Sequence, residues 1–104
     1  MTGLFVKKYH VAILEDDKAF VNQMVSALKL WYNSRIVVET YADSIKMFEG
    51  INNSKAKQCP FDLTVMGKDD IAEKAILNRT DPKMPVLLCK DLPTLRQEAS
   101  KFLL

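Results

Sequence analysis

The chain has 104 residues, of which 48% are hydrophobic, 27% charged and 9% aromatic, with a formal net charge of +2 at pH 7. This composition fits one globular domain with an ordinary core. Three glycines and four prolines are too few for a collagen-like or low-complexity chain, and the hydrophobic fraction is too high for a disordered one.

The N-terminal part of the chain predicts a strand followed by a helix. Residues 9–14 form a nearly continuous apolar run, typical of a strand that is buried on both faces of a parallel sheet. From Lys18 onward, apolar residues recur at three- and four-residue spacing, which predicts a helix. Asp16 or Asp17 is its expected N-cap, and residues 33–34 end it.

The next elements repeat this alternation. Residues 35–41 are rich in β-branched side chains and predict a second strand. Asp43 is the expected N-cap of a second helix, which runs down over residues 50–54. Residues 61–66 predict a third strand, which Gly67 ends.

A third helix and a fourth strand follow. Asp69 or Asp70 is the expected cap of a helix that extends to about Asn78. The two prolines within residues 81–85 break that helix. Residues 86–89 then predict a fourth buried strand.

The C-terminal residues predict a short helix around residues 94–100 and a fifth strand at 102–104. Strands and helices therefore alternate along the whole chain, which is typical of a parallel sheet with helices on both faces. We expect one domain, residues 1–104, of the α/β class. No linker is long enough to divide it.

The distribution of apolar and charged residues predicts a cytoplasmic protein. No apolar run approaches the length of a membrane span, and the lysines near the N-terminus follow a very short apolar stretch, the reverse of a secretory signal. Cys59 and Cys89 are too few and too far apart for a zinc site or a disulfide framework, so we expect reduced thiols. The small positive charge is spread out and does not indicate nucleic-acid binding.

The first strand ends at three consecutive acids: Glu15, Asp16 and Asp17. In parallel sheets, ligands bind beyond the carboxyl ends of the strands. These carboxylates would repel a phosphate, whereas converging carboxylates suit Mg²⁺. A small flavodoxin-like binder of a nucleotide or flavin is therefore disfavoured, and no glycine-rich loop supports it. The plainer alternative is an acidic helix cap in solvent.

Four segments together carry a family resemblance. They are residues 11–17, 61–66, 81–88 and 98–104. They resemble segments of response-regulator receiver domains. Residues 11–17 resemble the strand and acidic pair that holds Mg²⁺, and residues 61–66 resemble the third strand. Residues 81–88 resemble the approach to the fourth strand, and residues 98–104 resemble the segment before the cis-proline-linked lysine. The resemblance covers nearly the whole chain. It implies a flavodoxin-like, doubly wound, five-stranded parallel sheet of order 2-1-3-4-5, here with the fourth helix shortened and the last helix missing.

The chain departs from the receiver pattern at the phosphoacceptor. In receivers an aspartate closes the third strand, and this chain has Gly67 there. Glycine offers no nucleophile, so the resemblance implies a degenerate receiver, or pseudo-receiver, without phosphorylation chemistry at that site. A phosphorylatable receiver that uses Asp69 or Asp70 with Mg²⁺ is the alternative. A carboxylate displaced along the turn is poorly aimed for in-line transfer, which argues against it.

The residue that closes the fourth strand is a serine or threonine in receivers. Here the position aligns with Lys90, or with Cys89 if the register shifts by one residue. Our hypothesis is that the Lys90 ammonium reaches toward Glu15 and Asp16 and occupies the metal region. A Lys90 side chain extended into water is the alternative. Residual, weak Mg²⁺ binding by Glu15 and Asp16 is also an expectation, and we expect no other cofactor.

The sequence also suggests roles for Phe102 and His10. Phe102 aligns with the switch aromatic of receivers, and without a phosphate its expected role is packing. The phosphate-gripping lysine of the family would follow Leu104. His10 has no acid or serine partner within sequence reach, so we interpret it as structural.

These features predict a signalling domain without enzymatic activity. It is expected to act by homodimerisation or by docking on a protein partner, with no membrane contact. In the receiver order the first and last helices share one face of the sheet. Without the last helix, part of that face would be bare unless a second copy, a partner or a C-terminal extension of a longer regulator covers it.

Overall fold

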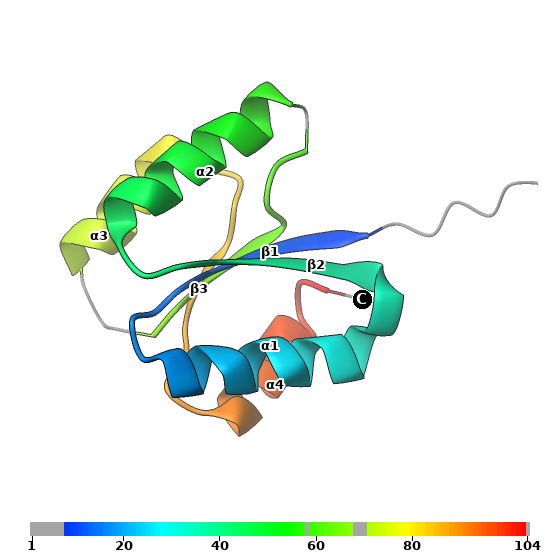
Figure 1. The fold of residues 1–104 in the computed structure, drawn as a ribbon. Coiled ribbons are helices and arrows are strands. Elements are labelled where there is room, and N and C mark those ends of the chain that lie inside the picture. The colour runs from blue at the N-terminus through cyan, green and yellow to red at the C-terminus, as the bar shows by residue number, and fades with distance from the viewer. Residues whose placement is uncertain (1–7, 58, 68–70, 104) are drawn as a thin grey trace, which may run out of the picture.

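A parallel β-sheet forms the centre of the protein (Figure 1). The computed structural model describes residues 8–57, 59–67 and 71–103. Within these ranges the sheet has four strands in the order β2-β1-β3-β4, all parallel. The strands are β1 (Tyr9–Leu14), β2 (Ile36–Tyr41), β3 (Leu63–Met66) and β4 (Val86–Leu88). The predicted α/β class, the parallel sheet and the order of these four strands are confirmed.

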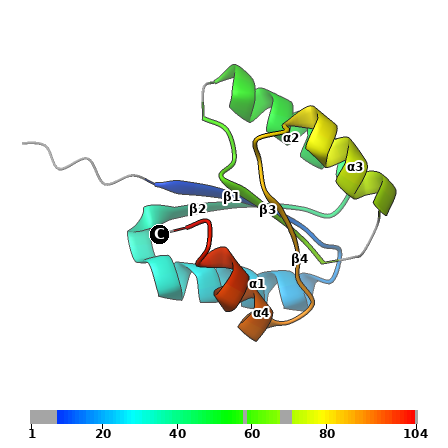
Figure 2. The same ribbon diagram turned by 180° about the vertical axis from the view of Figure 1, so that it is seen from behind.

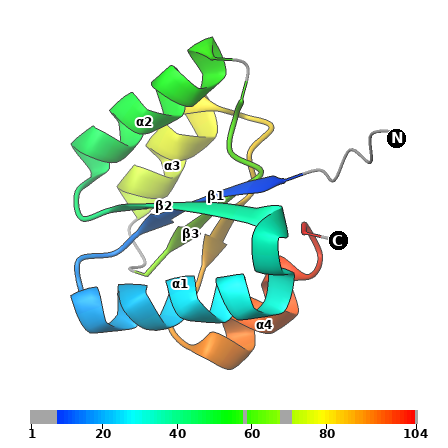
Figure 3. The ribbon, with the colours of Figure 1, turned by 45° about the vertical axis from the view of Figure 1, so that its right-hand side comes forward.

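Helices cover both faces of the sheet (Figure 3). The α-helices are α1 (Lys18–Tyr32), α2 (Ser44–Ala56), α3 (Ile71–Thr80) and α4 (Leu92–Ala99), and a 3₁₀ turn, η1 (Asn33–Arg35), follows α1. α2 and α3 lie on one face, while α1 and α4 lie together on the other (Figures 1 and 2). None of the helices in the described ranges is long and apolar enough to cross a membrane.

The helix starts follow the acidic caps predicted from the sequence. The side chain of Asp17 accepts hydrogen bonds from the backbone amides of Ala19 and Phe20, at 3.0 and 3.2 Å. Asp43 caps α2 in the same way, since it accepts from Lys46 N at 2.9 Å. These bonds satisfy amides that have no partner within their own helix. The two caps predicted for α3, Asp69 and Asp70, lie outside the described residues.

The predicted fifth strand is wrong for the residues that the structure describes, and Leu104 lies outside them. Residues 100–103 instead form turns that continue from α4. The amides of Phe102 and Leu103 both donate to Ala99 O, at 3.0 and 2.8 Å. Because these amides bond back to the helix, they do not form a ladder with β4. Leu103 is only 1% exposed and packs into the core, whereas Phe102 is 44% exposed.

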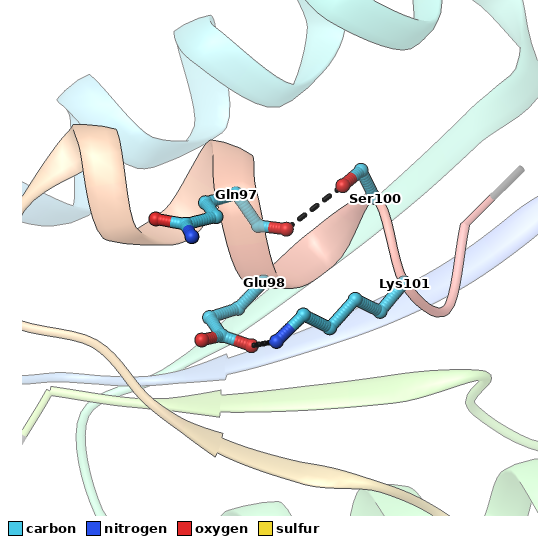
Figure 4. Close-up of polar contacts among 4 residues, drawn as sticks. All are labelled: Gln97, Glu98, Ser100 and Lys101. Carbon is cyan, nitrogen blue, oxygen red and sulfur yellow. Dashed lines mark hydrogen bonds and ion pairs between the residues drawn. The ribbon is translucent and has the colours of Figure 1, made fainter.

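Side-chain contacts support this turn. Figure 4 shows the Ser100 hydroxyl donating to Gln97 O at 2.8 Å, and an ion pair between Lys101 Nζ and Glu98 Oε2 at 2.7 Å. Both contacts span three residues, which is the spacing of a helical turn. The apolar run at the C-terminus thus extends the end of α4 rather than the sheet.

The sheet face that was expected to be bare is covered. The short C-terminal helix was predicted as a shortened fourth helix, and with eight residues it is short. It packs on the face of the sheet that α1 covers. Leu95, Ala99 and Leu103 join one core cluster with Met24 and Leu28 of α1. The prediction of an uncovered face is therefore wrong, because α4 itself crosses to that face.

Substitutions of the two neighbouring apolar residues after α4 test this arrangement. Leu103→Ala removes a fully buried side chain and should lower the free energy of unfolding by about 2–4 kcal/mol. Phe102→Ala removes a partly exposed ring and should cost less than about 1 kcal/mol. Urea unfolding of both variants measures the difference. An equal cost for the two would contradict a turn that buries Leu103 alone.

Candidate functional site

The carboxyl ends of the strands bring the predicted site positions to one edge of the sheet. The backbone amide of Gly67 donates to Leu14 O at 3.0 Å, and Cys89 N donates to Met66 O at 2.9 Å. These bonds extend the strand pairing past the end of β3 and the end of β4. Gly67 therefore lies beside the first acid after β1, Glu15, as the sequence predicts.

The Glu15 carboxylate folds back onto its own loop. Its Oε2 accepts hydrogen bonds from the backbone amides of Asp16 and Asp17, at 2.8 and 3.0 Å. The Glu15 backbone amide donates to Tyr41 O at 3.0 Å, which fixes the start of the loop against β2. Charge-assisted bonds of this kind are stronger than neutral ones. The carboxylate is thus held over the strand ends.

Gly67 leaves the space that the Glu15 carboxylate fills. A Cβ atom on residue 67 would collide with Glu15 Oε1 and would lie 2.7 Å from its Cδ atom. The described glycines have no positive φ, so the backbone at Gly67 does not itself demand glycine. A side chain at residue 67 would instead require the end of the Glu15 side chain to move. The carboxylate of Glu15 therefore occupies the space in which a side chain on residue 67 would begin.

Lys90 does not join this cluster. Its side chain is exposed, and no ion pair links it to Glu15 within the part of the chain that the structure describes. Cys89, the other candidate for this position, is buried and its thiol donates to Asp91 O at 2.9 Å. Burial raises the pKa of this thiol. The hypothesis that Lys90 occupies the metal region gains no support from this arrangement.

A small acidic hollow of about 70 Å³ lies next to the Glu15 loop. Its four carboxylate residues are Glu15, Asp16, Asp43 and Glu73. Glu15 and Asp43 already use carboxylate oxygens to accept backbone amides. In the described ranges, no group of three or more His, Cys, Asp or Glu residues is arranged to hold a metal ion. Weak Mg²⁺ binding by Glu15 and Asp16 stays a prediction.

The remaining predicted positions do not meet at this site. Phe102, the switch-aromatic position, lies in the turn after α4 and not on a strand at the sheet edge. The alternative phosphoacceptors, Asp69 and Asp70, lie outside the described residues. Of the site positions predicted from the sequence, the structure brings together Glu15, Asp16 and Gly67.

The sequence did not reveal a pairing at the opposite edge of the sheet. Cys59 Sγ lies 3.6 Å from His10 Nε2 and 3.8 Å from Nδ1, although 49 residues separate them. His10 is near the start of β1, and Cys59 precedes β3. In the order β2-β1-β3-β4 the strands β1 and β3 are neighbours, so their amino ends, and with them these two residues, meet. That topology is the signal by which the pair could have been found.

Comparisons with known proteins add no relative. No protein-family model matches the chain, and a search of curated proteins finds no similar sequence. The receiver resemblance therefore depends on the quoted segments and on the order of the elements.

The contact between Glu15 and Gly67 can be tested by a double-mutant cycle. Gly67→Ala should displace the carboxylate from its two amides and lower the free energy of unfolding by about 1–2 kcal/mol. In a Glu15→Ala background the same change should be neutral, or should stabilise by up to about 1 kcal/mol, because alanine restricts the unfolded chain. Denaturant unfolding of the four proteins gives the coupling energy. Additive effects would show that Glu15 does not fill this space.

Proposed function

We propose that this protein is an atypical, receiver-like signalling domain that acts through protein–protein contact without being phosphorylated. The observation that carries the proposal is the Glu15 carboxylate, which lies over Gly67 and fills the space of the phosphoacceptor side chain. A receiver needs a carboxylate nucleophile there, with room for a phosphoryl group in line. This chain has no nucleophile at residue 67, and the Glu15 carboxylate would have to move to make room for a phosphoryl group.

The acidic loop also lacks the freedom that a phosphotransfer metal needs. Mg²⁺ in such sites takes carboxylate oxygens together with waters and the substrate phosphate. Here one oxygen of Glu15 accepts two backbone amides, and Asp17 is occupied as the α1 cap. A metal that used Glu15 Oε2 or Asp17 Oδ1 would have to replace these bonds. Loss of the acceptor and retention of the caps together favour a scaffold role.

A contact function is supported by the outer surface of α1 and α4. A hollow of about 440 Å³ between these helices is lined by Trp31, Leu92, Pro93, Arg96 and Gln97. The Arg96 guanidinium lies over the Trp31 ring, 5.5 Å from its centroid. Tryptophan and arginine are the side chains most enriched at binding hot spots.

We expect a second copy of the chain to occupy this surface. Leu30, one residue before Trp31, is 74% exposed and projects from the same helix that lines the hollow. In a two-fold interface each copy contributes the same surface to the contact. An exposed apolar side chain, Leu30, and a hollow on the same surface suit such an interface, because each copy can insert its Leu30 into the hollow of the other. We therefore propose a second copy of this chain as the occupant.

The absence of phosphorylation is the first test. The protein is incubated with acetyl phosphate and Mg²⁺, beside a competent receiver as a positive control, and intact mass is measured. We expect no gain of a phosphoryl group, because Gly67 offers no acceptor. A Mg²⁺-dependent gain would contradict the proposal, and its loss in an Asp69→Asn/Asp70→Asn variant would establish the alternative acceptors.

Self-association is the second test. Light scattering coupled to size-exclusion chromatography should show a dimer whose fraction rises with protein concentration. Leu30→Glu should shift the protein to the monomer, because it places a charge in an apolar contact. Ile45→Glu is the matched control: Ile45 is 70% exposed on α2, on the other face of the sheet. A monomer at every concentration, or equal effects of both variants, would contradict the assigned surface.

A further inference from the structure

Cys59 and His10 form a thiol–imidazole pair at the amino-terminal edge of the sheet. The Cys59 side chain is exposed, and its Sγ lies 3.6 Å from His10 Nε2 and 3.8 Å from Nδ1. This edge is opposite the one that carries Glu15 and Gly67. We propose that the pair is a site of thiol–disulfide exchange, at which Cys59 is reversibly modified by a low-molecular-weight disulfide of the glutathione type.

The backbone holds both residues in place. His10 N donates to Asp62 Oδ2 at 2.8 Å, and Asp62 N donates to His10 O at 2.7 Å. The His10 ring packs against Phe61, with ring centroids 5.6 Å apart at an angle of 34°. Cys59 N donates to Ser54 O at 2.8 Å, at the end of α2. The thiol and the imidazole are therefore positioned by separate anchors on β1, α2 and the segment before β3.

A hollow of about 380 Å³ provides room for the modifying group. Besides Cys59 and His10, it is lined by Glu39, Tyr41, Gly50, Asn53, Ser54 and Lys57, and the Glu39 carboxylate accepts the Tyr41 hydroxyl. Amide, hydroxyl and ammonium groups suit the peptide bonds and carboxylates of a small peptide thiol. Burial, followed by the hydrogen bond that its hydroxyl donates to Glu39 at 2.9 Å, raises the pKa of Tyr41 to about 12. Tyr41 therefore presents a neutral ring to this hollow at physiological pH.

The exchange needs no reagent beyond the disulfide itself. The Cys59 proton passes to a His10 ring nitrogen, and the thiolate electron pair forms a bond to one sulfur of the disulfide. The sulfur–sulfur bond of the reagent breaks, and its electron pair leaves on the second sulfur. That leaving thiolate takes the proton from the His10 imidazolium. Cys59 is oxidised to a mixed disulfide, and half of the reagent is reduced to a free thiol.

The second cysteine provides an internal comparison. Cys89 is fully buried, and its thiol donates to Asp91 O at 2.9 Å. Burial raises the pKa of Cys89, which lowers the fraction of reactive thiolate. The two thiols of this chain therefore differ in access and in neighbours, and exchange should be selective for Cys59.

Mass spectrometry of the full chain with glutathione disulfide tests the site. The native protein should gain one glutathione, mapped to Cys59 and reversed by reductant. Cys59→Ser should gain none, and Cys89→Ser, which keeps a donor for Asp91 O, should react at the wild-type rate. A first adduct at Cys89 would overturn the proposal.

The role of His10 is tested by the rate of modification and its pH dependence. His10→Gln should slow the reaction of native Cys59 about tenfold and should remove the imidazole contribution from the pH profile of the rate. In urea, where the pair is broken, the variant and the wild type should react equally fast. Far-UV circular dichroism verifies that the variant is folded. Equal native rates, with an unchanged pH profile, would overturn the pairing.

Discussion

The packing of helices on both faces of this protein depends on β1, a central strand of the all-parallel sheet. β1 pairs with β2 on one side and β3 on the other, and its residues from Val11 to Leu14 are buried. A parallel sheet buries both faces, so helices must cover each of them. Two core clusters result: Val11 and Ile13 face α1 and α4, whereas Ala12 and Leu14 face α2 and the Met84 segment.

This constraint explains which parts of the fold were predictable. The alternation of a buried apolar run with helical spacing defines β1 and α1, and the carboxylates of Asp17 and Asp43 define where the first two helices begin. The face chosen by α4 was not predictable from its own residues. An amphipathic helix needs an apolar surface to cover, but its periodicity does not say which side of the sheet provides it. The turn at residues 100–103 was equally ambiguous, since an apolar run fits a strand or a tucked-in helix end.

The candidate site was likewise predictable only in part. Glu15 and Gly67 were recognisable individually, as an acid after one strand and as a glycine after another. Their mutual dependence was not, because it arises from a side-chain conformation that two backbone amides impose on Glu15. The pairing of His10 with Cys59 required the strand order, since only neighbouring strands bring residues 49 positions apart to one edge. Sequence identifies functional groups, and topology decides which of them meet.

The two edges of the sheet differ in how their polar groups are used. At the carboxyl edge, where parallel sheets usually carry their chemistry, Glu15 and Asp17 accept amides of their own loop and helix. Groups that are satisfied in this way stabilise the scaffold, and they are costly to recruit for a ligand. At the amino edge, the exposed thiol of Cys59 has a neighbouring imidazole and an open hollow. The carboxyl edge thus uses its polar groups within the scaffold, whereas the amino edge is where a thiol faces solvent.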